Sequence, residues 1–420
     1  MPAVRRSPTA DVVVVGAGPA GIAAAITLAR AGRDVTIVDK AVFPRDKCCG
    51  DGLTTLALRE LDTLGFEPAA VADWQVVGGA VLRAPSGREV TVPLPAGKGT
   101  YAAVAPRLQL DAALVDLSAK AGPHVLQGHA VTGIESGTAG GAGETDHVVA
   151  TLDGHPPIAA RYVIAADGMW SPVRKAIGLA ETGYLGEWHA FRQYATGVTG
   201  PAATHLYVWF EPDVLPGYAW SFPLPGGRAN IGFGVLRDGT RRVRDMRQQW
   251  ADLLQRPHIR AALGPSVEME GRHSAWPIPA GVDRAQLGRG RVLLTGDAAM
   301  ASDVMTGEGI GQALLTGRLA AEAVLAAGAL RPAAAVARYR QDVQHHLVGD
   351  HRMSAALGRV LAHRRGADGA IAVLDRAGAW GRRAFARWMF EDEPRAIAMT
   401  PSRWHRHVLA RPGVGAPNQS

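Results

Sequence analysis

Three glycines near the start of the chain have the spacing of a turn that binds a dinucleotide. Gly16, Gly18 and Gly21 follow a run of valines and open an alanine-rich segment with the apolar period of a helix. Gly16 permits a tight turn, Gly18 lets the backbone approach a pyrophosphate, and Gly21 lets the helix pack closely on the strand. Pro19 and Ala20 begin the helix, whose N–H groups and positive dipole end attract phosphates. A glycine-rich turn in an unrelated parallel sheet is the alternative.

Acidic residues stand at three places where a buried strand is expected to end. Open α/β sheets bind ligands at this edge, and Asp39 at a strand tip can accept hydrogen bonds from ribose hydroxyls. One acid after a strand is common, whereas three of them together with the glycine turn indicate a specific site. The residues are Asp39 followed by Lys40, Asp167 with Gly168, and Asp297 with Gly296.

The elements that must position these residues alternate between strand and helix periods. Residues 11–40 predict a strand, a helix and a second strand. The stretch 41–66 predicts a loop and then an amphipathic helix, whose apolar face we expect to contain Leu53, Leu56, Leu61 and Leu64. Further on, the patterns predict a hairpin at 75–94, a helix at 106–120, a strand at 124–135, a glycine-rich hairpin tip at 136–146, and strands at 147–152 and 161–167.

The second half of the chain changes in character. Residues 184–275 are rich in aromatic and β-branched residues, which predicts antiparallel strands with one helix at 242–255. Residues 306–328 predict the beginning of a long helix, and the rest of the chain is expected to be mostly helical with a mobile tail. We therefore expect an α/β fold. It has a Rossmann-like dinucleotide-binding domain (8–74, 100–183 and 285–330), a mainly antiparallel substrate-binding sheet domain (75–99 and 184–284) and a helical C-terminal region (331–420).

The composition limits the kinds of partner. The formal net charge is +7, and the 47% of hydrophobic residues fits a folded protein with a large core. No basic run is interleaved with aromatic residues, so nucleic acid is not expected as a partner. A basic surface for an anionic membrane or a phosphorylated substrate is one reading of the charge, and a generally alanine- and arginine-rich composition is the other. The histidines at 345, 346, 351, 363, 405 and 407 are scattered, so no metal site is expected.

The cysteines and the apolar runs indicate a cellular compartment. Cys48 and Cys49 are the two cysteines of the chain, and their adjacency excludes a disulfide framework and favours a reducing cytoplasm. The first ten residues are polar and do not resemble a secretory signal. Outside the N-terminal unit no window reaches about 18 uninterrupted apolar residues, so a transmembrane helix is not expected. The pattern indicates no oligomeric state.

Taken together, these motifs resemble those of FAD-dependent oxidoreductases of the para-hydroxybenzoate-hydroxylase fold class. The glycine turn, the pair Asp167-Gly168 and the pair Gly296-Asp297 stand in the order of that class, over roughly residues 10–330. The resemblance implies that Asp297 binds the ribityl chain of FAD. It also implies that Arg107 lies near the pyrophosphate and that the backbone of Val131 meets the adenine. For Arg107, a surface helix cap is the alternative.

A second set of motifs is similar to those of geranylgeranyl reductases. The segment Phe43–Gly52 resembles the FPRxKxCGxG loop of that family, and Tyr218–Pro223 with Gly232–Gly234 resembles its YxWxFP…GxG signature. Thr306–Ile310 resembles the start of its flavin-facing helix. Two departures are Cys48, where the family usually has proline, and Asp51, where it often has glycine. The resemblance places these residues at the cofactor or substrate: Arg45, Cys49, Gly50, Tyr218, Trp220, Gly307, Gly309 and Ile310.

Physical reasons accompany this second set. Tyr218, Trp220 and Phe222 alternate along one strand, so they share a face. With Gly232 and Gly234 on the return strand, we expect an aromatic wall facing a smooth floor, although an ordinary sheet core has the same pattern. A helix beginning near Gly307 would direct its positive end at the flavin. For Glu308, a role as dipole partner in the first turn of this helix is the alternative.

The sequence alone allows two roles for Cys49 in the loop Phe43–Gly52. Cys49 is either a redox or proton-donating thiol beside the flavin or a small residue that fits a tight loop. A disulfide between Cys48 and Cys49 would need a strained ring and is not expected.

The resemblance implies an FAD-dependent oxidoreductase that reduces C=C bonds of an isoprenoid, geranylgeranyl-type chain on a lipid or quinone. No second GxGxxG unit is present, so NAD(P)H or another external reductant would have no Rossmann unit of its own. Alternatives are an FAD-dependent monooxygenase (a hydroxylase or epoxidase), a halogenase, and a non-catalytic electron carrier. Halogenation is disfavoured, since the halogenase-type WxWxIP motif is half matched and no lysine lies between Lys47 and Lys98. The basic stretch 382–390 is a candidate for peripheral contact with the inner face of a membrane.

Overall fold

A computed structural model of the protein describes residues 9–137, 146–237, 245–397, 400–401, 404 and 411–416. Several expectations fall partly or wholly on other residues. The glycine-rich tip at 136–146, the start of the helix expected at 242–255, most of the C-terminal tail, and His405 with His407 lie outside the described residues.

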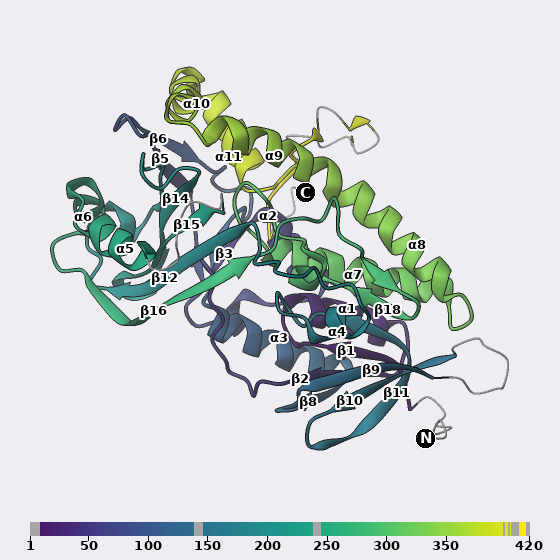
Figure 1. Cartoon of the computed structure of the whole chain (residues 1–420). Coiled ribbons are helices and arrows are strands. Elements are labelled where there is room, and N and C mark those ends of the chain that lie inside the picture. Colours follow the sequence, from purple (N-terminus) through teal and green to yellow (C-terminus); the bar gives the residue numbers. More distant parts are fainter. Residues whose placement is uncertain are drawn as a thin grey trace.

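An eight-stranded sheet forms the larger half of the molecule (Figure 1). Its central strands are parallel, and buried valines of β1 pack between the neighbouring strands and helices. Two further strands, β9 and β10, pair antiparallel with each other, and β10 joins them to the sheet by pairing antiparallel with β11. Along the main path the strands are β17 (Gly288–Arg289), β18 (Val292–Leu294), β11 (His155–Ala165), β1 (Ala10–Val15), β2 (Val35–Asp39) and β8 (His124–Gln127), with β9 (Val131–Gly137) and β10 (His147–Leu152) beside them.

Two helices cover this sheet in close contact with each other. Helix α1 (Pro19–Arg30) packs against α7 (Ile310–Ala327), and their approach is so tight that a Cβ added at Gly317 would lie 2.0 Å from the carbonyl oxygen of Ala20. Helix α7 is long and apolar enough to span a membrane, but 72% of it is buried inside the protein. Arg318 and Glu322 interrupt its apolar run, which is why the sequence did not predict this property. Burial identifies α7 as a core helix.

A seven-stranded sheet forms the second half. All its neighbouring strands are antiparallel except β13 and β5. The predicted hairpin at 75–94 supplies β5 and β6, which join strands from much later in the chain. The order is β16 (Glu268–Ile278), β12 (Trp188–Thr196), β15 (Arg228–Leu236), β14 (Gly217–Leu224), β13 (Leu206–Trp209), β5 (Gly79–Arg83) and β6 (Glu89–Pro93). The α/β fold with a second, mainly antiparallel sheet is thus confirmed.

The remaining elements connect and cover the two sheets. A three-stranded sheet, which the sequence did not predict, orders as β3 (Gly52–Leu53), β7 (Ala103–Val104) and β4 (Gln75–Val76). Helices α9 to α11 of the C-terminal region lie over the end of the second sheet near β6 (Figure 1). The other helices are α2 (Thr55–Thr63), α3 (Arg107–Ala121), α4 (Pro172–Ala176), α5 (Met246–Leu254), α6 (Pro257–Leu263) and α8 (Pro332–Val343), and the covering helices are α9 (Gly349–Leu361), α10 (Arg364–Arg376) and α11 (Gly378–Met389).

Three local predictions need correction, and one helix was missed. The strand expected at 124–135 is two strands, β8 and β9, because the chain turns at Gly128 with a positive φ of 81° and each strand takes a different partner. Leu53 belongs to β3 and not to the helix that follows it. The helix that was expected to begin near Gly307 begins at Ile310. Helix α6 follows α5 and was not predicted.

Candidate active site

A single cavity of about 1020 Å³ runs from the edge of the first sheet to the face of the second. Almost all predicted site residues line it, although they come from distant parts of the chain. Gly21 does not, because it packs α1 against the glycine turn. The lining residues among those predicted are Gly16, Gly18, Ala20, Asp39, Lys40, Arg45, Cys49, Gly50, Arg107, Val131, Asp167, Gly168, Tyr218, Trp220, Gly296, Asp297, Gly307, Gly309 and Ile310.

At two of its glycines, the glycine turn packs so closely against other backbone atoms that a side chain would not fit. A Cβ at Gly16 would lie 2.3 Å from the carbonyl oxygen of Ala166, and Gly16 has a φ of 102°. A Cβ at Gly21 would lie 1.8 Å from the carbonyl oxygen of Gly16. At Gly18 the nearest atom to such a Cβ is Nη2 of Arg45 at 3.7 Å, so this backbone faces the open cavity.

Asp39 holds the turn as well as facing the cavity. Its Oδ2 accepts a hydrogen bond of 2.7 Å from the N–H of Ala17, and its Oδ1 accepts one of 2.8 Å from the N–H of Ala41. The carboxylate therefore fixes the end of β2 against the glycine turn. Lys40 beside it is exposed at the cavity edge.

Two arginines converge on a buried acid that the sequence did not single out. Arg107 donates two hydrogen bonds of 2.7 Å to the carboxylate of Asp111, one helical turn further along α3. Nη1 of Arg45 lies 2.6 Å from Oδ2 of the same fully buried carboxylate. Arg107 is 5% exposed, so it is not a surface helix cap. Asp111 thus orients two positive groups at the cavity wall.

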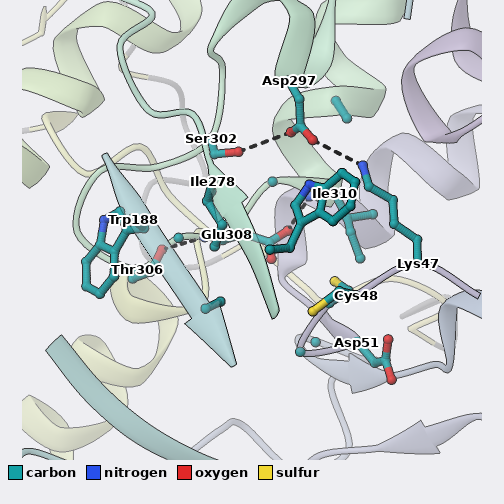
Figure 2. A pocket seen from close by; sticks show the side chains of 18 of the residues that line it. Lys47, Cys48, Asp51, Trp188, Ile278, Asp297, Ser302, Thr306, Glu308 and Ile310 are labelled. Atoms are coloured by element: carbon teal, nitrogen blue, oxygen red, sulfur yellow. Dashed lines mark hydrogen bonds and ion pairs between the residues drawn. The ribbon is translucent and has the colours of Figure 1, made fainter. Parts of the chain in front are cut away.

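A second charged pair, Lys47 and Asp297, also lines the cavity. Nζ of Lys47 lies 3.1 Å from Oδ2 of Asp297, and Oγ of Ser302 lies 3.5 Å from Oδ1 (Figure 2). Asp167, at the end of β11, accepts a hydrogen bond of 3.0 Å from the N–H of Val173, and so supports the start of α4. Lys47 was not predicted as a site residue, although it is part of the FPRxKxC match and one of few lysines in the sequence.

The N-terminus of α7 points into the same cavity. Gly309 is its N-cap, and Oε1 of Glu308 accepts hydrogen bonds of 3.0 and 3.1 Å from the N–H groups of Ile310 and Gly311. Burial, and then the nearby carboxyl of Glu391, raises the pKa of Glu308 to about 8. Glu308 therefore caps the helix and holds a proton at neutral pH, which is more than the simple dipole partner considered from the sequence.

The two cysteines are free thiols beside the cavity. Burial raises the pKa of Cys49 to about 11, with the guanidinium of Arg107 acting in the opposite direction. Burial also raises the pKa of Cys48 to about 12. Both side chains are consequently thiols and not thiolates at neutral pH, so each carries a proton and is poorly suited to nucleophilic attack.

The aromatic residues of β14 share one face, as predicted. The rings of Tyr218 and Trp220 are 6.0 Å apart, and those of Trp220 and Phe222 are also 6.0 Å apart. The hydroxyl of Tyr218 donates to the carbonyl oxygen of Thr306, which ties this wall to the segment before α7.

The expected smooth floor opposite this wall is wrong. Gly232 and Gly234 are cross-strand partners of Trp220 and Tyr218 in the same sheet, since β14 and β15 pair directly. A Cβ at Gly232 would lie 2.3 Å from Cζ2 of Trp220. The glycines therefore create the space in which the Trp220 ring lies flat along its own sheet.

The far end of the cavity is apolar and is closed by the C-terminal helices. Strands β5, β13 and β14 form one side, and helices α9, α10 and α11 form the other. The apolar lining consists of Leu82, Leu206, Val208, Phe210 and Phe222 from the sheet, with Leu357, Val360, Leu361, Ala370, Ile371, Leu374, Phe385, Trp388, Met389 and Phe390 from the C-terminal region. This is an extended apolar chamber, and the sequence did not predict that the C-terminal helices would build half of it.

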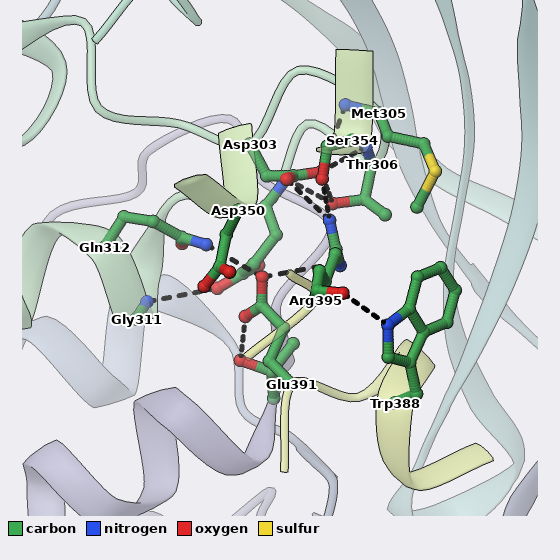
Figure 3. A network of polar contacts seen from close by, with 12 residues as sticks. Asp303, Met305, Thr306, Gly311, Gln312, Asp350, Ser354, Trp388, Glu391 and Arg395 are labelled. Atoms are coloured by element: carbon green, nitrogen blue, oxygen red, sulfur yellow. Dashed lines mark hydrogen bonds and ion pairs between the residues drawn. The ribbon is translucent and has the colours of Figure 1, made fainter. Parts of the chain in front are cut away.

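A buried ionic network fastens these helices to the cavity (Figure 3). Arg395 is 4% exposed, and its Nη1 lies 2.5 Å from Oδ2 of Asp303. Its Nη2 lies 3.3 Å from Oε1 of Glu391, which also accepts a hydrogen bond of 2.9 Å from Gln312 of α7. Asp303 in turn accepts a hydrogen bond from the hydroxyl of Thr306. The chain after α11 is thereby locked against the segment that precedes α7.

Comparison with known proteins agrees with this geometry. The model of the FAD binding domain family matches residues 9–315. The menaquinone reductase of Mycolicibacterium smegmatis is 36% identical over 341 residues, which cover 76% of this chain and 77% of that protein. Digeranylgeranylglycerophospholipid reductase 2 of Methanopyrus kandleri is 34% identical over 319 residues, covering 74% of this chain and 76% of its own. The chain belongs to the geranylgeranyl reductase family of FAD-dependent oxidoreductases.

Solved structures show the same fold at lower identity. A geranylgeranyl bacteriochlorophyll reductase-like protein from Thermoplasma acidophilum superposes with a TM-score of 0.77 at 20% identity, covering 94% of this chain and 99% of that one. The halogenase PltM, as a mutant in complex with FAD, gives 0.69 at 16% identity, covering 93% and 85%. The reductase-like protein is the better match to the fold of this family member.

The cavity of this enzyme fits FAD. Backbone without side chains lines it at Gly16, Gly18 and Gly168, and an added Cβ at Gly168 would meet no atom within 4 Å. Cationic groups of Arg45 and Lys47 border the space between the glycine turn and α7. The dinucleotide end and the α7 end belong to one continuous space, as an extended cofactor requires.

Proposed function

We propose that the glycine turn, with Asp39 and the backbone near Val131, holds the AMP half of FAD. Arg45 and Arg107 would lie near the pyrophosphate, Asp297 at the ribityl chain, and the N-terminus of α7 at the isoalloxazine ring. Support comes from their common cavity and from the cationic and helix-dipole groups that border it. When bound and reduced, FAD supplies a hydride. The same arrangement supports the division of the chain into an FAD-binding domain, a substrate-binding sheet domain and a helical C-terminal region.

The substrate of the enzyme is an isoprenoid chain carried by a lipid or quinone, and the reaction is reduction of its C=C bonds. The observation that carries this proposal is the apolar chamber between β14 and helices α9–α11, which adjoins the predicted flavin position. An extended chamber lined by leucine, phenylalanine and tryptophan fits a long hydrocarbon chain. The names of relatives, a menaquinone reductase and a digeranylgeranylglycerophospholipid reductase, agree with such a substrate.

Cys49 provides the proton that completes the reduction. Addition of a hydride to one alkene carbon leaves the other carbon in need of a proton. The thiol lines the cavity at the junction of the flavin end and the aromatic wall, and its raised pKa keeps it protonated. Tyr218 and Trp220 position the chain and exclude water from this junction.

The electrons come from NAD(P)H or another external reductant in the cytoplasm, delivered without a second Rossmann unit.

The substrate enters from the inner face of a membrane that the C-terminal helices contact. Val360 lines the chamber and is 53% exposed, and the exposed Arg364 and Arg365 begin the next helix, α10. An apolar opening beside cationic groups suits an anionic lipid surface.

Anaerobic reoxidation of the flavin tests the proposed reaction. Enzyme reduced with dithionite is mixed without oxygen with menaquinone that carries an unsaturated prenyl chain, and flavin absorbance is followed. The same headgroup with a fully saturated chain is the matched control. We expect reoxidation by the unsaturated compound alone, because the chain accepts the hydride. Equal reoxidation by both compounds would show that the quinone ring is the acceptor and would refute the proposal.

A further inference from the structure

Asp51 occupies a backbone conformation that side chains rarely adopt. Its φ is 63°, in the left-handed region that favours glycine, and its carboxylate is fully buried. A buried carboxylate in such a conformation persists only where its surroundings fix it. The position lies two residues after Cys49, in the loop that lines the cavity (Figure 2).

Three elements supply hydrogen bonds to this carboxylate. Its Oδ2 accepts one of 2.6 Å from the hydroxyl of Tyr194 on β12 and one of 2.8 Å from Nδ2 of Asn230 on β15. Its Oδ1 accepts one of 3.3 Å from the N–H of Arg107 at the start of α3. Asp51 therefore joins the start of α3 to strands β12 and β15 of the seven-stranded sheet.

The same partners hold the backbone of Cys49. Asn230 Nδ2 also donates a hydrogen bond of 2.8 Å to the carbonyl oxygen of Cys49, and Nε of Arg192 donates one of 3.3 Å to it. The indole N–H of Trp220 donates to Oδ1 of Asn230 at 3.2 Å. A continuous path of hydrogen bonds thus runs from the aromatic wall through Asn230 to Asp51 and Cys49.

The charges around Asp51 come from several elements. Arg192 and Tyr194 of β12 and Arg107 of α3 face it, and Cys48, Cys49 and Asp46 belong to its own loop. Burial raises the pKa of Asp51 to about 6, while the hydrogen bonds from Tyr194 and Asn230 act in the opposite direction. Asp51 is consequently ionised at neutral pH, as an acceptor of three hydrogen bonds should be.

We propose that Asp51 is a positioning residue for Cys49, because its carboxylate, held by Tyr194 and Asn230, fixes the thiol at the cavity beside Trp220. This inference rests on the proposed function, since it assigns the position of Cys49 a role in the reaction. Misplacement of a reacting group by about 1 Å can cost about 100-fold in rate. The loop geometry is therefore a determinant of turnover.

Labelling of the thiol tests the positional part independently of any substrate. Cys48→Ala leaves Cys49 as the one cysteine of the chain. In this parent the rate constant of the Cys49 thiolate with iodoacetamide reports the exposure of Cys49, and it is taken from the pH dependence of labelling so that any change in the thiol pKa is separated from it. Asp51→Gly removes the carboxylate while tolerating the positive φ, and Tyr194→Phe removes one donor if the first variant folds poorly. Asp252→Asn, on the exposed side of α5, is the matched control.

Three readouts decide the outcome. We expect labelling about tenfold faster and turnover at least about tenfold slower in Asp51→Gly, with flavin absorbance retained and Asp252→Asn unchanged. Turnover of the parent should fall as the pH is lowered through about 6, and Asp51→Asn should lack this fall. Unchanged labelling in both loop variants, or faster labelling with unchanged turnover, would overturn the proposal. If the parent fails to reduce any prenyl chain, the proposed function fails while the labelling still tests the loop.

Discussion

At the scale of single residues, the site keeps Glu308 and its two thiols neutral by burying them. Cys49 and Glu308 both have a raised pKa, chiefly because the surrounding protein disfavours their charged forms. Neutral groups of this kind can hold a proton beside a cofactor that carries negative charge when reduced. The residue types were visible in the sequence, whereas their protonation depends on burial that the fold creates.

Replacing Cys49 by serine should slow reduction of the prenyl chain by about 100-fold, the typical contribution of a general acid. A hydroxyl gives up its proton much less readily than a thiol, while it leaves the size of the side chain nearly unchanged. Turnover of Cys49→Ser and Cys48→Ser under anaerobic conditions, with flavin content measured in both, checks this. Equal loss in both variants, or no loss in either, would contradict a specific role for Cys49.

The raised pKa of Glu308 predicts that the stability of the protein depends on pH. Its pKa is raised from 4.5 to about 8, so the folded state binds this proton more tightly than the unfolded state does. The free energy of unfolding then falls as the pH rises from about 4.5 to about 8. Glu308→Gln lacks this titration and should gain stability relative to the wild type, by a few kcal/mol, between pH 5 and pH 8.5.

Denaturant unfolding of the flavin-free protein at the two pH values measures this difference. Glu322→Gln, at a half-exposed ion pair on the same helix, is the control and should show little pH-dependent change. A constant difference between Glu308→Gln and the wild type would mean that Glu308 titrates in its ordinary range.

Residue roles could be predicted where a local pattern defines them. Gly16, Gly18 and Asp39 follow from one strand–helix–strand segment, and the structure places all three at the cavity. Asp111 and Asn230 could not be predicted, because their importance arises from partners brought together by the fold. Asn230 and Asp51, for example, are 179 residues apart in the sequence.

At the scale of elements, register decides what the aromatic strand can do. The alternation of Tyr218, Trp220 and Phe222 was enough to predict their common face. The role of Gly232 could not be predicted, because the sequence of a strand does not reveal which residue of the neighbouring strand lies across from Gly232. Because β14 pairs directly with β15, the ring of Trp220 packs over Gly232. The break between β8 and β9 was missed for a similar reason, since each strand pairs with a different neighbour.

Gly232→Ala should destabilise the protein by about 3 kcal/mol, because overpacking forces a ring or the backbone to move. The added Cβ would lie 2.3 Å from Cζ2 of Trp220 and 2.4 Å from the carbonyl oxygen of Phe191. Gly78→Ala, where a Cβ meets no atom within 4 Å, is the control and should cost less than about 0.5 kcal/mol. Thermal or denaturant unfolding compares them, and equal stability would refute the assigned role of Gly232.

At the scale of the whole molecule, the C-terminal helices complete the site. Their helical character could be predicted from the sequence, but it could not be predicted that they form one side of the apolar chamber. Arg387, for instance, belongs to the basic stretch 382–390, yet it is buried and pairs with Asp392. Such placement depends on long-range packing of α11 against β6 and on the network around Arg395.

The proposed membrane contact predicts a measurable loss of lipid binding. Trp380 is 73% exposed and Val373 is 70% exposed, both on the helices that roof the chamber. Replacing both by serine should weaken sedimentation with vesicles of phosphatidylcholine and phosphatidylglycerol by several-fold, while turnover of detergent-dispersed substrate stays unchanged. Leu330→Ser, 90% exposed between α7 and α8, is the control. Equal binding by all three proteins would contradict contact through these helices.

The mass of the product tests the central claim most directly. Reduced enzyme and a lipid bearing an unsaturated geranylgeranyl chain are allowed to react without oxygen, and the lipid is then analysed by mass spectrometry with fragmentation. The apolar chamber and the family predict a gain of two hydrogens for each bond reduced, confined to the prenyl chain, with the headgroup unchanged. A product that forms only when oxygen is admitted and that gains one oxygen atom would contradict the account and identify the enzyme as a monooxygenase.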